Sequence, residues 1–230
     1  MSRICFEENY IIVYPSYEQT RSHKHNMLHI FIGESELSLE TEFGEITGRV
    51  IFLDGGVLHS KPKGQLSFFL FVDPTSILAE RIREYFSGQN AYATVDSFKS
   101  YGCEPNDIRK SLSEFFGDDC FIKRDNLDTR VLSLIEEIDS FQCLGKRVSD
   151  IAARIVYSES YLSHLFKSES GVSLKNYLLM KQLEYAWTRI SRGEEITKVS
   201  LEAGFATPSH FADVCLKLTG ISVTDVLKQI

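Results

Sequence analysis

The sequence of 230 residues has no long apolar run. No segment approaches the roughly 20 consecutive apolar residues that a membrane-spanning helix needs. The first eight residues, Met1 to Glu8, lack the apolar stretch of a secretory signal peptide. We therefore expect a cytoplasmic protein that does not cross a membrane.

The sequence also has little of the chemistry that catalysis or cross-linking requires. Its 5 cysteines are scattered and include no CxxC pair. An odd, dispersed set of this kind predicts reduced thiols rather than a disulfide framework. The sequence shows no Ser/His/Asp spacing and no glycine-rich phosphate loop. We therefore do not expect an enzyme.

An excess of positive charge is missing as well. The 25 lysines and arginines are outnumbered by 32 aspartates and glutamates, and the net charge is −7. This excludes a broad basic surface that coats nucleic acid without specificity. It is compatible with a compact domain that reads one DNA sequence. The 43% of hydrophobic residues and 25% of charged residues are typical of globular proteins and exclude a disordered or collagen-like chain.

Residues 1–74 show the pattern of short strands. Apolar or alternating segments are separated by Gly, Pro and Asp residues, which are typical of turns. The expected strands are 11–14, 28–32, 36–40, 49–53 and 66–72. Short strands in close succession predict a small all-β barrel or sandwich.

Residues 75–122 show the period of helices instead. Thr75 or Ser76 can cap a first helix, and a second is expected to begin at Pro105 and end at Gly117. Each helix carries one apolar stripe. The stripes either pack on the barrel or supply an interface between two copies of the chain. Because two stripes follow one another, they favour a homodimer.

A polar stretch around 118–126 is the expected linker to an all-helical part, residues 125–230. This part contains a pattern that repeats weakly, from Ser158 and again from Thr207. Both residues are good helix caps, and Pro208 follows Thr207 at the first helical position. A short helix and a tight turn precede each cap, and Gly204 suits the positive φ of the second turn. Short helix, turn and capped helix form the helix-turn-helix pattern.

The residues of this repeat resemble the DNA-binding domain of AraC/XylS-type transcription regulators. The resemblance covers roughly 125–230, with its motifs between Val148 and Ile230. It is carried by Asp150-Ile151-Ala152, Ser158-x-x-Tyr161-Leu162-x-x-Leu165-Phe166-Lys167, Gly171-Val172-Ser173-x-x-x-Tyr177, Leu183-x-x-Ala186, and Ile196 to Gly204-Phe205-x-x-x-Ser209-x-Phe211. Two unequal repeats joined by a long helix, 174–190, are far more specific than a lone helix-turn-helix. The resemblance implies double-stranded promoter DNA and RNA polymerase as partners.

The resemblance also implies which side chains face DNA. In the first copy they lie outward, opposite Leu162, Leu165 and Phe166, and in the second copy they follow the second cap. The expected DNA-binding residues are Ser160, Ser163, His164, Lys167, Ser209, His210 and Lys217. Where the family often has arginine, this chain has His164, Gln182 and Asp213. Because phosphate repels an aspartate, we expect the first copy to read bases more strongly and the second copy mainly to dock.

The N-terminal strands resemble the cupin-like sensing domain that often accompanies this DNA-binding domain. The chain has H-x-H at His23 and His25, a histidine at position 29 where a glutamate is usual, and His59 after a glycine-rich turn. The resemblance places these four residues at the metal-ligand positions of metal-binding cupins. Four imidazoles suit Zn, Ni, Cu or Fe. The open alternatives are a small effector bound without metal and, for His29, a hydrogen-bonded core residue.

The expected fold class is α+β: a cupin-like β-barrel over 1–74, connecting helices over 75–122 and an all-α domain with two helix-turn-helix motifs over 125–230. The expected function is a sequence-specific transcription regulator whose barrel senses a ligand or metal. Two alternatives stay open. A metal-dependent cupin enzyme would explain the histidines but leave the paired motifs without a role. A regulator that acts by protein contact alone would explain the acidic charge and Asp213.

Overall fold

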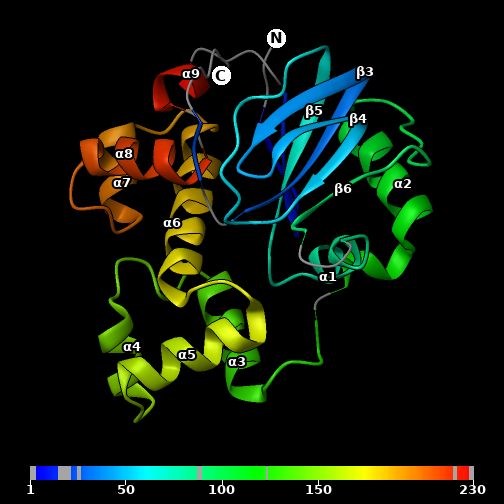
Figure 1. Ribbon diagram of the computed structural model, residues 1–230. Coiled ribbons are helices and arrows are strands. Elements are labelled where there is room, and N and C mark those ends of the chain that lie inside the picture. The colour runs from blue at the N-terminus through cyan, green and yellow to red at the C-terminus, as the bar shows by residue number, and fades with distance from the viewer. Residues whose placement is uncertain are drawn as a thin grey trace. The chain divides into compact units, whose positions relative to one another are not determined.

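A computed structural model gives the fold of the chain. It describes residues 4–14, 22–24, 27–86, 90–122, 124–219 and 222–227. Contacts divide the chain into two compact units (Figure 1). The first unit is Met1–Lys123 together with Lys217–Ile230, and the second unit is Arg124–Leu216. None of the described helices is long and apolar enough to cross a membrane.

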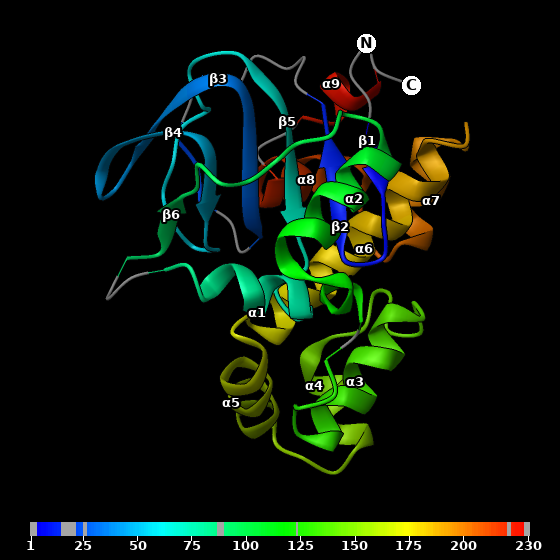
Figure 2. The ribbon, with the colours of Figure 1, turned by 90° about the vertical axis from the view of Figure 1, so that its right-hand side faces the viewer.

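The first unit is built on an antiparallel sheet of six strands. In chain order they are β1 (Ile4–Phe6), β2 (Tyr10–Val13), β3 (Leu28–Thr41), β4 (Gly44–Leu53), β5 (Leu66–Val72) and β6 (Tyr92–Thr94). Their order in the sheet is β1-β2-β5-β3-β4-β6, which Figure 2 shows from right to left. The hairpin of β3 and β4 turns at Gly44, whose φ of 105° suits glycine.

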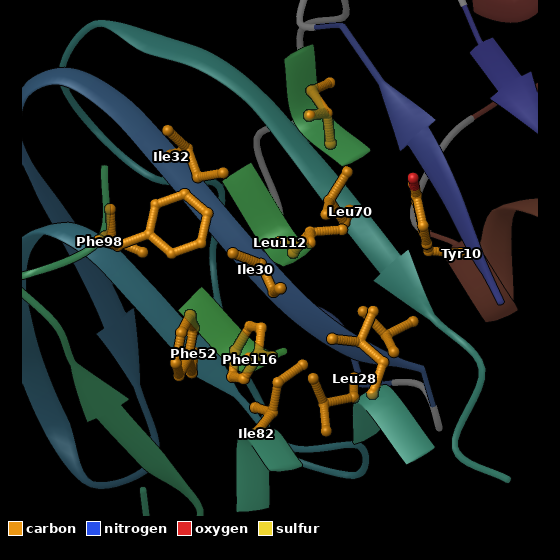
Figure 3. Packing of buried hydrophobic residues seen from close by; sticks show 14 of the residues in the cluster. Tyr10, Leu28, Ile30, Ile32, Phe52, Leu70, Ile82, Phe98, Leu112 and Phe116 are labelled. Carbon is orange, nitrogen blue, oxygen red and sulfur yellow. The ribbon is translucent and has the colours of Figure 1, made fainter. Parts of the chain in front are cut away.

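Alternation along the strands gives the sheet two apolar faces. On β3, Leu28, Ile30 and Ile32 belong to the main hydrophobic core of the unit, whereas His29 and Phe31 point to the opposite face. Two helices cover the first face, α1 (Ile77–Arg83) and α2 (Pro105–Phe116). Figure 3 shows side chains of both helices packed against those of the strands. The short helix η1 (Asp118–Phe121) adds the buried Cys120 to this core.

The apolar stripes of α1 and α2 are used inside this unit. Leu78 and Ile82 of α1, and Ile108 and Leu112 of α2, are each at most 1% exposed. The stripes therefore pack on the sheet, which is the first of the two alternatives that the sequence left open. The homodimer loses this basis and remains a prediction.

The sheet does not close into the barrel that the sequence predicted. β1 and β6 have 3 residues each and form the two ends of the described sheet. Instead, a segment over 58–63 pairs with the outer half of β3: the Lys63 N–H donates to the Ser38 oxygen at 2.7 Å, and the Ser60 N–H donates to the Glu40 oxygen at 2.9 Å. The prediction of a cupin-like barrel is corrected to an open antiparallel sheet within an α+β chain.

The second unit is helical. Its helices are α3 (Thr129–Asp139), α4 (Val148–Arg154), α5 (Glu159–Ser170), α6 (Leu174–Ile190), α7 (Ile196–Glu202) and α8 (Pro208–Thr219), of which α8 runs past the end of the unit; α9 (Val223–Leu227) follows. The long α6 connects the group α3–α5 with α7 and α8 (Figure 1). Its buried residues include Tyr177, Leu183, Ala186 and Trp187. The unit therefore contains two copies of short helix, turn and longer helix, joined by α6.

Candidate functional site

The first helix-turn-helix presents a row of polar side chains on α5. The Ser158 hydroxyl caps this helix and accepts from the Tyr161 N–H at 3.2 Å. Leu162 and Phe166 are at most 1% exposed and anchor the helix, with the Phe166 ring 5.4 Å from that of Tyr177. The opposite side carries the predicted residues: Ser160, His164 and Lys167 are exposed and Ser163 is half-buried. Hydroxyl, imidazole and ammonium groups on such a face can bond base edges and phosphates.

The second helix-turn-helix presents a poorer set on α8. The Thr207 hydroxyl accepts from the His210 N–H at 3.0 Å, so this cap also forms as predicted. Ser209, His210 and Lys217 are exposed, and so is Asp213. However, the His210 Nδ1 accepts from the Ala206 N–H at 3.3 Å and its ring lies against Phe205. Only the Nε2 side of this imidazole is left to face a ligand.

Lys217 differs from the other predicted residues in its place in the chain. It lies in the last turn of α8, but contacts assign it to the first unit. The structure therefore brings together Ser160, Ser163, His164 and Lys167 on one helix, and Ser209 and His210 on another. Lys217 lies on that second helix too, seven residues after His210 and therefore on the same side of α8.

The two turns are built differently. Each has a positive-φ residue directly after the C-cap of its first helix: Val156 with φ 59° and Gly204 with φ 89°. Gly204 also packs closely against the loop before α4: a Cβ added at this position would lie only 2.3 Å from the Cα of Gly145. Only glycine fits there, and this contact holds the second turn against the entry of the first motif.

The sequence did not indicate a contact that joins α3 to α5. The Arg130 Nη1 donates to the Tyr161 hydroxyl at 2.8 Å, and the Asp128 N–H donates to Glu169 at 2.9 Å. Hydrogen bonds from Arg130 hold the pKa of Asp128 at about 2, so this helix cap stays charged. Tyr161 was visible only as a family motif residue, and nothing in the sequence paired it with Arg130.

Three of the four predicted metal ligands meet on the second face of the sheet. The rings of His23 and His59 have centroids 4.4 Å apart, and those of His29 and His59 are 4.8 Å apart. A backbone bridge between His23 and His59 brings the first pair together. His29 also lies against Phe31 and Phe71. His25 lies outside the described residues.

The surroundings of the histidine cluster (His23, His29 and His59) keep the imidazole of His59 uncharged at neutral pH. Burial, with a smaller contribution from repulsion by His23, lowers the pKa of His59 to about 4. The His59 Nδ1 lies 2.9 Å from the Val57 carbonyl oxygen, so it carries the proton and the lone pair is on Nε2. A neutral imidazole oriented in this way suits a metal ligand. Even so, the described residues form no group of three or more His, Cys, Asp or Glu side chains placed to hold a metal ion. Metal binding therefore stays a prediction.

Comparison with known families identifies the region that holds both helix-turn-helix motifs. Residues 151–229 match the family described as a helix-turn-helix domain. The C-terminal part of the chain therefore contains a helix-turn-helix domain, which agrees with its resemblance to the DNA-binding domain of AraC/XylS-type regulators. This match supports the DNA-binding transcription regulator that the sequence predicted. No curated protein matches the chain in sequence.

Solved structures extend the likeness beyond the AraC-type domain. Apo ToxT K231A from Vibrio cholerae is 16% identical, with a TM-score of 0.55, and the match covers 96% of this chain and 98% of ToxT. Wild-type ToxT bound to an unsaturated fatty acid is 15% identical, with a TM-score of 0.51 and coverage of 96% and 95%. At this identity the comparison shows a shared fold along nearly the whole chain.

Proposed function

We propose that the chain binds promoter DNA in a sequence-specific way, with α5 as the main reading helix. The observation that carries this proposal is the row of Ser160, Ser163, His164 and Lys167 on a capped helix whose other side is anchored in the core. A recognition helix places such a row in the major groove, where hydroxyl and imidazole groups discriminate between bases. Lys167 supplies a cation for a backbone phosphate.

The second motif contributes docking more than reading. Asp213 is exposed on α8, where it repels phosphates. His210 already uses its Nδ1 within its own turn. Ser209 is the remaining small polar side chain near the start of α8, and Lys217 follows in its last turn. Asymmetry of this kind favours an operator with one strongly specified half and one weakly specified half.

The N-terminal unit is proposed to sense an effector at the histidine cluster. The cluster combines three imidazoles with the rings of Phe31, Phe69 and Phe71. Such a face suits a small molecule with an apolar body and one polar group, or a transition metal. The relatives with the same fold include ToxT bound to an unsaturated fatty acid and to (E)-4-(8-methylnaphthalen-1-yl)but-3-enoic acid. By analogy, an apolar carboxylic acid is the first effector class to test here.

The remaining partners follow from this role. A promoter-binding regulator of this type acts in the cytoplasm, contacts RNA polymerase and is expected to work as a homodimer. An effector changes DNA binding only if it has different affinities for the active and inactive forms. Regulation through the histidine cluster therefore requires two states of the chain with different DNA affinity.

Duplexes selected from a random library test the DNA-binding proposal. Lys167→Ala should weaken binding to all selected duplexes and lower the salt slope by about one, because one phosphate contact is lost. His164→Ala should instead relax preference at one or two base pairs, at a cost of about 1–3 kcal/mol. Lys63→Ala removes an exposed lysine of the first unit, so it should change neither the affinity for the duplexes nor the base preference. If both α5 variants bind like the wild type, α5 is not the reading helix.

Effector binding is tested separately, by loading purified protein with Zn, Ni, Cu or Fe(II), or with a long-chain fatty acid, followed by desalting. Stoichiometric metal that is lost in His59→Gln supports a metal effector. Fatty acid that is retained by the wild type and lost in Phe71→Ala supports an apolar effector. If neither is retained, sensing at this cluster is excluded while the DNA-binding proposal stands.

A further inference from the structure

The second unit contains a pocket that the function described so far does not use. Its volume is about 440 Å³. Its walls come from four places: the loop before α4, the first residue of α5, one side of α6, and the turn between α7 and α8. The residues that carry the argument are Lys146, Arg147, Glu159, Lys175, Gln182 and Gly204. All of them lie in the same compact unit.

The pocket is positively charged although the chain as a whole is acidic. Three of its side chains are cations, Lys146, Arg147 and Lys175, against one carboxylate, Glu159. All four are exposed at the surface. Lys146 lies 3.8 Å from Glu137, whereas Arg147 and Lys175 form no ion pair with any residue in the described part of the chain. Two cations are thus available to an anion that enters.

Gln182 adds a second and independent observation. It is 8% exposed and lines the pocket, yet its side-chain amide makes no hydrogen bond to any described residue. The amide atoms are open to the pocket, where a ligand or water can bond them. The Nε2 lies beside Gly204, 2.7 Å from where a Cβ of that residue would be. The amide donor therefore sits at the point where the two motifs touch.

The position of the pocket indicates which anion it meets. Glu159 begins α5, the proposed reading helix, and Gly204 begins the turn that leads into α8. In a helix-turn-helix, the start of the recognition helix is the end that approaches the duplex. A pocket between these two points faces the stretch of backbone between the two grooves that are read.

We propose that this pocket binds a phosphate group, contributed by the DNA backbone between the two major-groove contacts. Arg147 and Lys175 supply charge, and the Gln182 amide donates a directional hydrogen bond. The proposal rests on the proposed function, since the pocket meets this phosphate only when the protein is bound to DNA. It also gives the neutral amide of Gln182 a role as a donor beside the two cations.

Salt-dependent binding of the full-length protein to a selected duplex is the first test. Arg147→Ala and Lys175→Ala combined should lower the slope of log K against log salt by about two. Gln182→Leu should weaken binding without changing the slope, because it removes a neutral donor. Lys198→Ala removes a 59%-exposed lysine of the same unit outside the pocket and serves as the matched control. Thermal melts confirm that each variant is folded.

A scan with neutral methylphosphonates locates the phosphate. Replacing one backbone phosphate at a time should reveal a central position that costs the wild type about tenfold in affinity and costs the Arg147→Ala/Lys175→Ala variant nothing further. A parallel titration with inorganic phosphate, followed by 31P NMR, tests for a free anion as the source. Binding there that is lost in the variants, with an unchanged duplex slope, assigns the pocket to a free phosphate compound.

Two other results are decisive. If the pocket variants match the control in both the duplex and the phosphate experiments, the pocket binds no phosphate and the proposal is wrong. If the wild type selects no duplex at all, the proposed function fails, and the phosphate titration still decides whether the pocket takes the anion.

Discussion

At position 156 a β-branched side chain holds a left-handed backbone conformation. Val156 has φ 59° and is 89% exposed, so no packing compensates for its strain. The corresponding residue of the second turn is Gly204, which adopts φ 89° without a steric penalty. The first motif is therefore strained at its turn.

Val156→Gly should stabilise the protein. Relief of the strain outweighs the extra freedom that glycine gives the unfolded chain, and the expected gain in the free energy of unfolding is about 1 kcal/mol. Urea denaturation measures it, with Val156→Ala as an intermediate. Gly204→Ala should act in the opposite direction, because its Cβ would clash with the backbone of Gly145. A Val156→Gly variant less stable than the wild type would contradict this account of the turn.

His59 should make stability depend on pH. Its pKa is about 4 when folded, against 6.5 ordinarily, so the unfolded chain binds a proton that the folded chain does not. The contribution is full above pH 6.5 and is lost as the pH falls from 6.5 to 4, by up to roughly 3 kcal/mol. His59→Gln should flatten the decline of unfolding free energy in this window. An identical decline in both proteins would show that other groups dominate.

At the scale of elements, helices with clear caps were predictable. Pro105 and Gly117 predicted the bounds of one helix, which the structure confirms in α2, and the long joining helix expected over 174–190 is confirmed in α6. Strands were less accessible. β1 and β6 have 3 residues each, which is too few for a periodic signal. The sequence predicted two strands, 28–32 and 36–40, where the structure has the single strand β3 with a register shift between Ile32 and Leu37.

The candidate site was predictable only where it depends on local helical spacing. Polar residues of α5 and α8 follow from helical spacing once the caps are placed, as Ser160 and His164 show. The pocket around Gln182 does not follow from helical spacing, because its walls come from elements that are distant in sequence. His23 and His59 meet through a backbone bridge between loops. No local pattern indicates this bridge.

Asp213 tests the role of α8 as an element. It is exposed on the second recognition helix, so Asp213→Arg exchanges repulsion of phosphate for attraction. We expect tighter binding to every duplex, with little change in sequence preference and a steeper salt dependence. Fluorescence anisotropy at several salt concentrations measures both quantities. Unchanged affinity at low salt would place this side of α8 away from DNA.

At the scale of the whole molecule, the chain joins an open antiparallel sheet, with two helices on its core face, to a helical unit with two unequal DNA-binding motifs. The sheet carries the histidine cluster, and the helical unit carries the groups proposed to bind DNA. This division separates the proposed sensing chemistry from the proposed reading chemistry. An effector at the cluster has to change the affinity of the helical unit for DNA, since that is the readout of regulation.

The central claim is that two helix-turn-helix motifs in one chain read consecutive major grooves. Methylation interference on a selected duplex tests it most directly. The account predicts two segments on one face of the DNA in which base methylation interferes with binding. They should lie about 34 Å or one helical turn apart, with stronger interference in the segment read by α5. His164→Ala should weaken the interference in that segment first. Interference in only one segment, or no interference from base methylation in either segment, would contradict the claim.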